Sequence, residues 1–273
     1  MQTTLEKKSK NPFKKIPWYG WVGAIIFIVF QIGLYKLGGL ISERFIAPLW
    51  SVHPLTKIDD FIPYCPYFFI QIYFLAYAFW FIGPLVISTG KKENFINFMI
   101  YGTIASLVGF LWFIFMPTWM NRETEGLLNL ADDIKTPFTR FLMKAIIEMD
   151  TGKMAWNLCP SYHCMASALC AFGVLKIKEH HVGTQVGFSI FAILVFASTV
   201  LVKQHYFVDI LGGVAVATIP FLIVRFWWKP GERIMIKNPL FLNTKITKKD
   251  VEEAKEAKDI KPEEVKEIIE EKK

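Results

Sequence analysis

Residues 201–213 read LVKQHYFVDILGG, and they join two of the most apolar runs in the chain. The run that ends at Val202 is FSIFAILVFASTVLV, and the run that begins at Val214 is VAVATIPFLIV. Between the runs stand Lys203, His205 and Asp209. If the runs lie in a bilayer, ionisable groups at this place cost several kcal/mol unless they are solvated or paired. These three residues therefore need a structural or chemical reason.

The composition of the whole chain indicates a membrane protein. Of its 273 residues, 53% are hydrophobic and 16% are aromatic, with 25 Phe and 9 Trp. The apolar residues come in blocks, and the charged residues collect at the two ends and in short gaps, which is a membrane pattern. The net charge of +7 does not indicate nucleic-acid binding, because no basic stripe is interleaved with aromatic residues.

Six apolar stretches predict an all-α, polytopic bundle of six transmembrane helices, since a spanning helix needs roughly 20 apolar residues. The fourth stretch is the weakest, because Ser, His, Cys and Ala dilute it. The predicted domains are a basic cytoplasmic segment over 1–18, a six-span catalytic domain over 19–228 and a charged cytoplasmic tail over 229–273. The six stretches are 21–40, 61–88, 94–117, 161–177, 183–202 and 205–228.

The distribution of lysine and arginine predicts the orientation in the cell membrane. The N-terminal lysines, the Lys91–Lys92 pair, the 176–181 turn and the start of the tail fall on one side. By the positive-inside rule that side is cytoplasmic, so both termini are expected inside and segment 118–160 outside. The basic N-terminus is followed by an apolar run without a small-residue cleavage site, which predicts a retained signal anchor. Residues 135–149 predict an amphipathic helix along the membrane interface.

His205 and Asp209 are four residues apart, so on a helix they share one face. A carboxylate at that place accepts a hydrogen bond from one imidazole nitrogen, which fixes the tautomer and leaves the lone pair of the other nitrogen free. A nucleophilic or basic histidine needs this arrangement. The alternative is a polar pair that caps a helix end.

A second polar motif is PSYH, residues 160–163. Pro160 suits the start of a helix, and the N–H groups of Ser161 and Tyr162 would then lie in a first turn that favours an anion. An ordinary helix start is the alternative. The predicted topology places His163 and His205 at the same outer face, although neither motif was used to derive that topology.

PSYH, followed downstream by Ser198-x6-His205-x3-Asp209, resembles the second and third signature motifs of the type 2 phosphatidic acid phosphatase superfamily. The resemblance covers about 95–228 and implies a metal-independent lipid phosphatase, without a cofactor, on a six-helix membrane core. It implies that His205 attacks phosphorus and Asp209 orients it. It also implies that His163 protonates the leaving lipid oxygen and then activates water, while Ser161 and Ser198 contact phosphate.

The chain departs from the pattern of that superfamily at two cationic positions. Thr199 follows Ser198 where the third motif usually has arginine. In the first motif, usually Lys-x6-Arg-Pro, Phe115 stands at the lysine position and Glu123 follows Arg122. We therefore expect three further residues to contribute to phosphate binding: Tyr162, Lys203 and Arg122.

Two other functions fit parts of the pattern. KQHYFVD also resembles the HYxxD segment of sphingomyelin and inositol-phosphorylceramide synthases, which implies a lipid phosphotransferase as the alternative enzyme. A transporter could use His and Asp as a proton relay, but a relay needs ionisable groups at several depths of the membrane.

The remaining residues of interest are expected to be structural. His53 is expected at the surface or an interface. The four cysteines have no CxxC pairs or metal-ligand spacing, so we expect no metal site. They are expected as thiols, with a disulfide from Cys65 to Cys159 or Cys164 as the alternative.

Overall fold

The computed structural model describes residues 16–149, 153–175 and 177–237. Most of the predicted N-terminal segment and of the predicted tail lie outside these ranges. The chain divides into two compact units, Met1–Gly231 and Glu232–Lys273, and the bundle below belongs to the first. The α-helices and β-strands are α1 (Trp18–Ile41), α2 (Pro66–Ile87), α3 (Lys92–Phe115), β1 (Trp119–Asn121), α4 (Leu127–Asp132), α5 (Pro137–Met149), β2 (Met154–Trp156), α6 (Tyr162–Val174), α7 (Val182–Leu201), α8 (Phe207–Leu222) and α9 (Pro230–Lys237).

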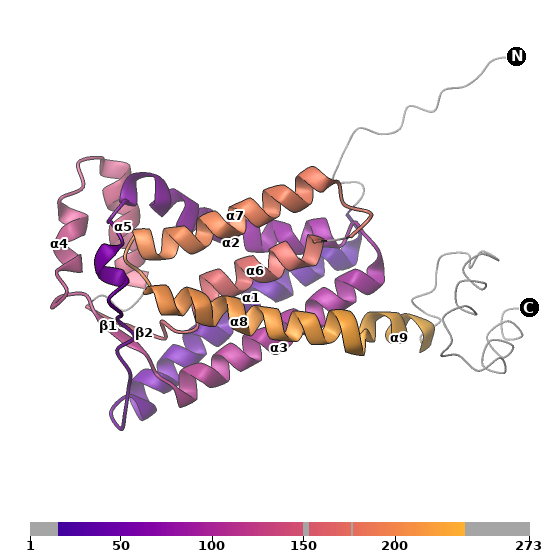
Figure 1. Ribbon diagram of the computed structural model, residues 1–273, viewed down its shortest axis with the longest axis horizontal. Helices are drawn as coiled ribbons and strands as arrows, with labels where there is room; N and C mark the ends of the chain where they lie inside the picture. The colour runs from indigo at the N-terminus through magenta and orange to yellow at the C-terminus, as the bar shows by residue number, and fades with distance from the viewer. Residues whose placement is uncertain (1–15, 150–152, 176, 238–273) are drawn as a thin grey trace, which may run out of the picture. The chain divides into compact units, whose positions relative to one another are not determined.

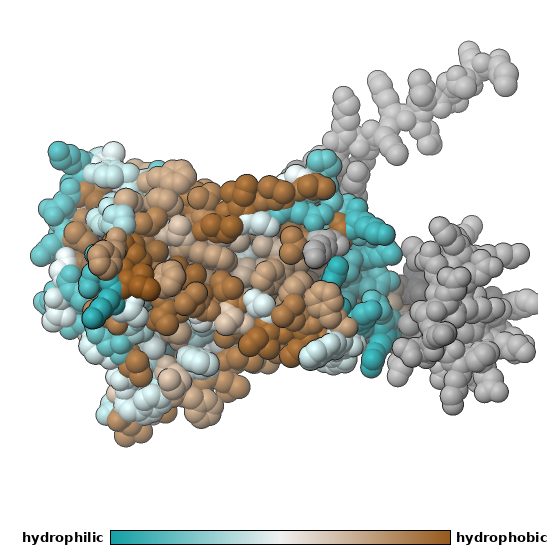
Figure 2. Space-filling model, in the orientation of Figure 1, coloured by the Kyte–Doolittle hydropathy of each residue, from teal (hydrophilic) through white to brown (hydrophobic). Residues whose placement is uncertain are grey.

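Five helices of the described chain are long and apolar enough to cross a membrane. They cover Trp18–Ile46, Pro66–Ile87, Lys92–Phe115, Val182–Leu201 and Phe207–Trp228, where π-helical turns extend α1 and α8. Large apolar side chains on them face outward, for example Val29 and Ile193, each 62% exposed. Figure 2 shows the resulting apolar belt between hydrophilic ends. The chain is a multi-pass membrane protein.

The sixth predicted span is not confirmed. Helix α6 has 13 residues and is about 20 Å long, shorter than the roughly 30 Å hydrocarbon core of a bilayer. It lies among its neighbours in the bundle, and it contacts α2, α3, α7 and α8 (Figure 1). All its residues except Phe172 are buried. A helix enclosed by protein does not have to match the thickness of the lipid, so the prediction over 161–177 was too long.

A glycine lets α8 approach the first turn of α6. A Cβ atom at Gly213 would lie 2.5 Å from the carbonyl oxygen of Ser161, closer than real Cβ contacts. Any side chain here would push α8, which begins two residues after His205, away from α6, which carries His163. The packing of small residues therefore positions the predicted site.

The segment between α3 and α6 contains a small sheet that the sequence did not predict. Strands β1 and β2 pair antiparallel, with Trp119 opposite Trp156. Between them, α5 is the predicted amphipathic helix and contacts α2, with Met143 and Ile146 buried and Phe138 exposed. Helices α4 and α5 lie with the two strands at one end of the bundle (Figure 1).

Candidate active site

Asp209 lies in the first turn of α8, whereas His205 lies in the turn just before that helix, so the prediction that both lie on one helix is wrong for His205. Their side chains nevertheless contact each other. Nδ1 of His205 is 3.3 Å from Oδ2 of Asp209, and the same oxygen accepts the backbone N–H of Tyr206 at 2.8 Å. Asp209 thus caps the helix and also holds the imidazole. The two alternatives that the sequence offered, an oriented histidine and a helix cap, therefore both apply. With Nδ1–H donating to the carboxylate, the lone pair of Nε2 remains for chemistry.

Helix α6 brings the second histidine to the first. The backbone N–H of Ser161 donates to the carbonyl oxygen of Asp209 at 3.0 Å, which ties the start of α6 to α8. The ring centroids of His163 and His205 are 6.3 Å apart, with 57° between the ring planes. Both side chains are buried. Two imidazoles, one from α6 and one from the turn before α8, are therefore close enough to contact one phosphoryl group.

Aromatic rings surround His163. Its imidazole stacks on Tyr73 with 4.0 Å between ring centroids, and Tyr77 and Trp80 lie at 5.3 and 4.9 Å. Within the described chain, Nε2 of His163 is buried and has no hydrogen-bond partner. The ring is thus held by packing while one nitrogen is left to act on a ligand.

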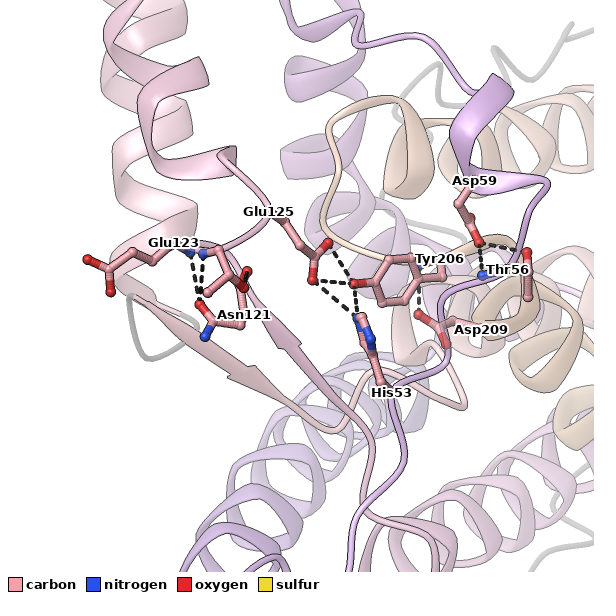
Figure 3. A network of polar contacts seen from close by, with 9 residues as sticks. His53, Thr56, Asp59, Asn121, Glu123, Glu125, Tyr206 and Asp209 are labelled. Carbon is pink, nitrogen blue, oxygen red and sulfur yellow. Dashed lines mark hydrogen bonds and ion pairs between the residues drawn. The ribbon is translucent and has the colours of Figure 1, made fainter.

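A polar network holds the residue after His205, as Figure 3 shows. The Tyr206 hydroxyl donates to Glu125 at 2.7 Å and lies 2.8 Å from Nε2 of His53. Burial and the neighbouring Glu125 raise the pKa of Tyr206, so the hydroxyl stays a donor at neutral pH. His53 also stacks on Trp119, with 4.4 Å between ring centroids. The side chain of His53 is 30% exposed, which agrees with the expected surface position. Its isolated place in a loop gave no signal of this contact.

The loop around Asp59 fastens the same turn from another direction. Oδ1 of Asp59 accepts the backbone N–H of Phe207 at 2.7 Å, and its other oxygen accepts the backbone N–H of Thr56. The Lys203 ammonium donates to the carbonyl oxygen of Ile62 at 2.5 Å, and its distance to the Asp59 carbonyl is 3.4 Å. Lys203 is therefore engaged with the loop in this structure, although it lies close to His205.

The remaining predicted phosphate ligands form hydrogen bonds with other groups of the protein in this structure. Arg122 is fully buried and donates to the side-chain oxygen of Gln204, the residue before His205, at 2.7 Å. The Ser198 hydroxyl donates to the Val195 carbonyl at 2.7 Å. The Tyr162 hydroxyl donates to the Ser106 carbonyl on α3 at 2.7 Å. The structure thus brings five of the predicted site residues together: His163, His205, Asp209, Ser161 and Lys203. The hydroxyls of Ser198 and Tyr162 instead donate hydrogen bonds to backbone carbonyl oxygens.

The two histidines open onto different cavities. His205 lines a cavity of about 340 Å³ that is rich in charged side chains, among them Asp59, Asp60, Glu125 and Lys203. His163 lines a smaller cavity of about 80 Å³ whose walls are mainly aromatic and aliphatic. The lining residues of the smaller cavity are Gln31, Ile32, Tyr35, Lys36, Tyr77, Trp80, Met149, Tyr162 and His163.

The described residues form neither a cluster of metal ligands nor a disulfide. In residues 16–149, 153–175 and 177–237, no group of three or more His, Cys, Asp or Glu side chains is arranged to hold a metal ion. All four cysteines are free thiols. Burial and the nearby Asp209 raise the pKa of Cys159 to about 12, so this thiol stays protonated.

The fold and the site together define a multi-pass membrane protein with a histidine pair at one end of its bundle. A family model described as the PAP2 superfamily matches residues 56–223, which is more than half of the chain. The chain therefore belongs to the PAP2 superfamily, and the resemblance in its motifs is confirmed. Membership implies a scaffold of the phosphatase and phosphotransferase kind that acts on a phosphate ester. Comparisons with curated proteins and with solved structures gave no match.

Proposed function

We propose that this protein hydrolyses a phosphate ester of a lipid, a mono- or diphosphate, through a phosphohistidine formed on His205. The observation that carries the proposal is the pair of imidazoles, 6.3 Å apart, one from α6 and one from the turn before α8, where Asp209 holds it. Phosphoryl transfer depends mainly on positioning and on charge stabilisation, and both can come from residues of this site.

In the first step, Nε2 of His205 attacks phosphorus and the bond from phosphorus to the lipid oxygen breaks. Burial lowers the pKa of His163, and the negative charge of a bound phosphate counteracts this and favours the protonated ring. His163 gives its proton to that oxygen, and the lipid alcohol leaves. Asp209 stabilises the positive charge on the His205 imidazole. The leaving group must lie opposite the attacking nitrogen, so the acid has to come from another element, as His163 does.

In the second step, neutral His163 takes a proton from a water molecule, whose oxygen attacks phosphorus. The phosphorus–nitrogen bond breaks, which frees His205 and leaves His163 protonated for the next cycle. Phosphate is released. We propose that Ser161, Tyr162, Ser198, Lys203 and Arg122 bind the phosphate oxygens, with Lys203 exchanging its loop carbonyls for the substrate.

We also propose that the site faces the extracytoplasmic side and that both termini are cytoplasmic. The support is the excess of lysine and arginine in the segments at the other end of the bundle. Single cysteines at the exposed positions 124 and 179 of a variant without native cysteines test this orientation in intact cells. An impermeant thiol reagent should label position 124 and not position 179, and the reverse pattern would contradict the orientation.

A lipid phosphotransferase is the second candidate function, and the large cavity beside His205 favours it. Asp59, Asp60 and Glu125 line that cavity with Lys203. Carboxylates repel a second phosphate, but they accept hydrogen bonds from a hydroxyl-rich head group and attract a cationic one. A phosphodiester could leave such a head group on the phosphohistidine and pass it to a lipid alcohol instead of water.

Purified protein with a panel of lipid phosphates and phosphodiesters separates these functions. A phosphatase releases inorganic phosphate without an added alcohol, and chelator leaves the rate unchanged. A phosphotransferase moves a labelled head group to added diacylglycerol or ceramide. Turnover that disappears with chelator and returns only with metal would contradict the phosphohistidine mechanism.

A further inference from the structure

The small cavity beside His163 includes part of α1, a helix outside the region that the superfamily model matches. Gln31 of α1 lines this cavity and is 2% exposed. In the part of the chain that the structure describes, its side-chain oxygen Oε1 has no hydrogen-bond partner. Nε2 of His163 is in the same state in the same cavity. Two buried polar atoms without partners thus line one cavity.

The orientation of the Gln31 amide follows from its neighbours. The Ser106 hydroxyl donates to the Gly102 carbonyl at 2.6 Å, so its single proton is already used. Ser106 can then only accept from Gln31, whose Nε2 lies 2.6 Å away. The nitrogen therefore faces Ser106, and Oε1 is the acceptor that remains. Buried acceptors of this kind are costly when unpaired, and a ligand with a donor would relieve the cost.

The walls of the cavity match the part of a lipid next to its phosphate ester. Tyr35, Tyr77 and Trp80 line it together with Ile32, whose side chain is exposed on α1. The exposed ammonium of Lys36, which donates to the Met149 carbonyl at 2.6 Å, also lines it and complements an anion. An apolar cavity with one cation and the proton donor His163 suits the alcohol part of a lipid phosphate.

We propose that this cavity binds the leaving lipid alcohol and that Oε1 of Gln31 accepts a hydrogen bond from a free hydroxyl next to the phosphate ester. The inference rests on the proposed hydrolysis and names a substrate class within it. Lipid phosphates with a hydroxyl on the carbon beside the phosphate-bearing carbon are favoured over lipids in which that hydroxyl is acylated or absent. A site that binds a hydroxyl rejects the analogue without it, because its own acceptor is then left unpaired.

Binding of product alcohols tests the inference without any turnover. The probes are 1-oleoylglycerol and the monooleate of 1,3-propanediol, which lacks the secondary hydroxyl, titrated into the full-length protein in detergent micelles. The unaltered protein should bind 1-oleoylglycerol about 10-fold more tightly, which corresponds to one buried hydrogen bond. Gln31→Leu should bind both probes equally.

Gln71→Leu is the matched control, since Gln71 is exposed on α2 and its side chain bonds only the Tyr67 carbonyl of its own helix among the described residues. It should keep the 10-fold preference. Gln31→Met preserves the length of the side chain and replaces Gln31→Leu if the latter does not fold. Equal binding by the unaltered protein, or an unchanged preference in the Gln31 variant, would overturn the inference.

Hydrolysis of the two corresponding 3-phosphates separates this inference from the proposed function. The ratio of kcat/KM between hydroxylated and deoxy substrates should be about 10 in the unaltered protein and about 1 in Gln31→Leu. Phosphate release with no preference overturns the hydroxyl recognition alone. A binding preference without phosphate release overturns the hydrolysis alone.

Discussion

His163 and His205 are close together, but their surroundings are chemically opposite. His205 bonds a carboxylate, and the residue after it is held by His53 and Glu125 (Figure 3). His163 is packed among Tyr73, Tyr77 and Trp80, and a nitrogen of its ring has no partner in the described chain. A carboxylate fixes the tautomer and stabilises the positive charge of the ring once it is phosphorylated, as a nucleophile requires. An aromatic cage fixes the other ring, and burial together with the neighbouring His205 lowers the pKa of His163, which favours the neutral form that takes a proton from water.

The largest expected effect comes from removing the nucleophile. His205→Ala should lower kcat at least about 10³-fold on every substrate, because no other group can form the covalent intermediate. Initial rates of phosphate release measure the loss. The control is His181→Ala, since His181 is exposed at the start of α7 and its removal should leave turnover intact. A comparable loss in the control would point to misfolding.

The next largest effect concerns the carboxylate that makes the two surroundings different. Asp209→Asn should keep the fold and lower kcat roughly 10²–10⁴-fold, by analogy with the orienting carboxylate of a catalytic triad. The amide neither fixes the same tautomer nor stabilises the cationic ring. Asp132→Asn is the control, because Asp132 pairs with Lys144 on an exposed surface. An Asp209→Asn protein with full activity would mean that the pair only caps the helix.

Replacing His163 should have an effect that depends on the leaving group. His163→Ala should slow hydrolysis of a lipid phosphate about 10²-fold or more, since the alkoxide then leaves without a proton. An aryl phosphate has a better leaving group and should be affected roughly 10-fold less. The ratio of the two rates is the readout. Equal losses on both substrates would contradict a role as general acid.

The smallest expected effect comes from the network beyond His205. Tyr206→Phe removes a hydroxyl that bonds Glu125 and His53, while those two side chains still contact each other at 3.2 Å. The stability should fall by about 1 kcal/mol, and kcat only a few-fold, because Asp209 still holds the imidazole. Thermal unfolding in detergent measures the former. Tyr67→Phe on the exposed face of α2 is the control. An equal loss of stability in that variant would mean that the network around Tyr206 does not stabilise the protein.

The sequence predicted the parts of the site that local geometry determines. The spacing of His205 and Asp209 predicted their contact, although His205 lies before α8 and not in it. PSYH predicted the start of a helix, although Pro160 lies outside α6 and Ser161 is its cap. Five of the six predicted spans correspond to helices long and apolar enough to cross a membrane, because the length of such a run must match the lipid. Helix α6 does not follow this rule, because protein encloses it. It is therefore shorter than the predicted stretch 161–177.

The sequence could not predict contacts between distant segments. His53 meets Tyr206 across 153 positions, and Asp59 meets Phe207 across 148. Nothing local to His53 or Asp59 distinguishes them from ordinary loop residues. The unpaired oxygen of Gln31 could not be predicted for the same reason, because the Gln31 amide is oriented by Ser106, 75 positions away. Such contacts appear only when the packing of the helices is known.

The most direct test of the account is a search for phosphate bound covalently to the protein. Turnover of a labelled aryl phosphate is stopped within milliseconds, and the denatured protein is examined for phosphate that is labile in acid and stable in base. The account predicts such phosphate on His205, more of it in His163→Ala, where water activation is impaired, and none in His205→Ala. Labelled phosphohistidine of equal amount in His205→Ala, or its absence from a protein that is turning over substrate, would contradict the central claim.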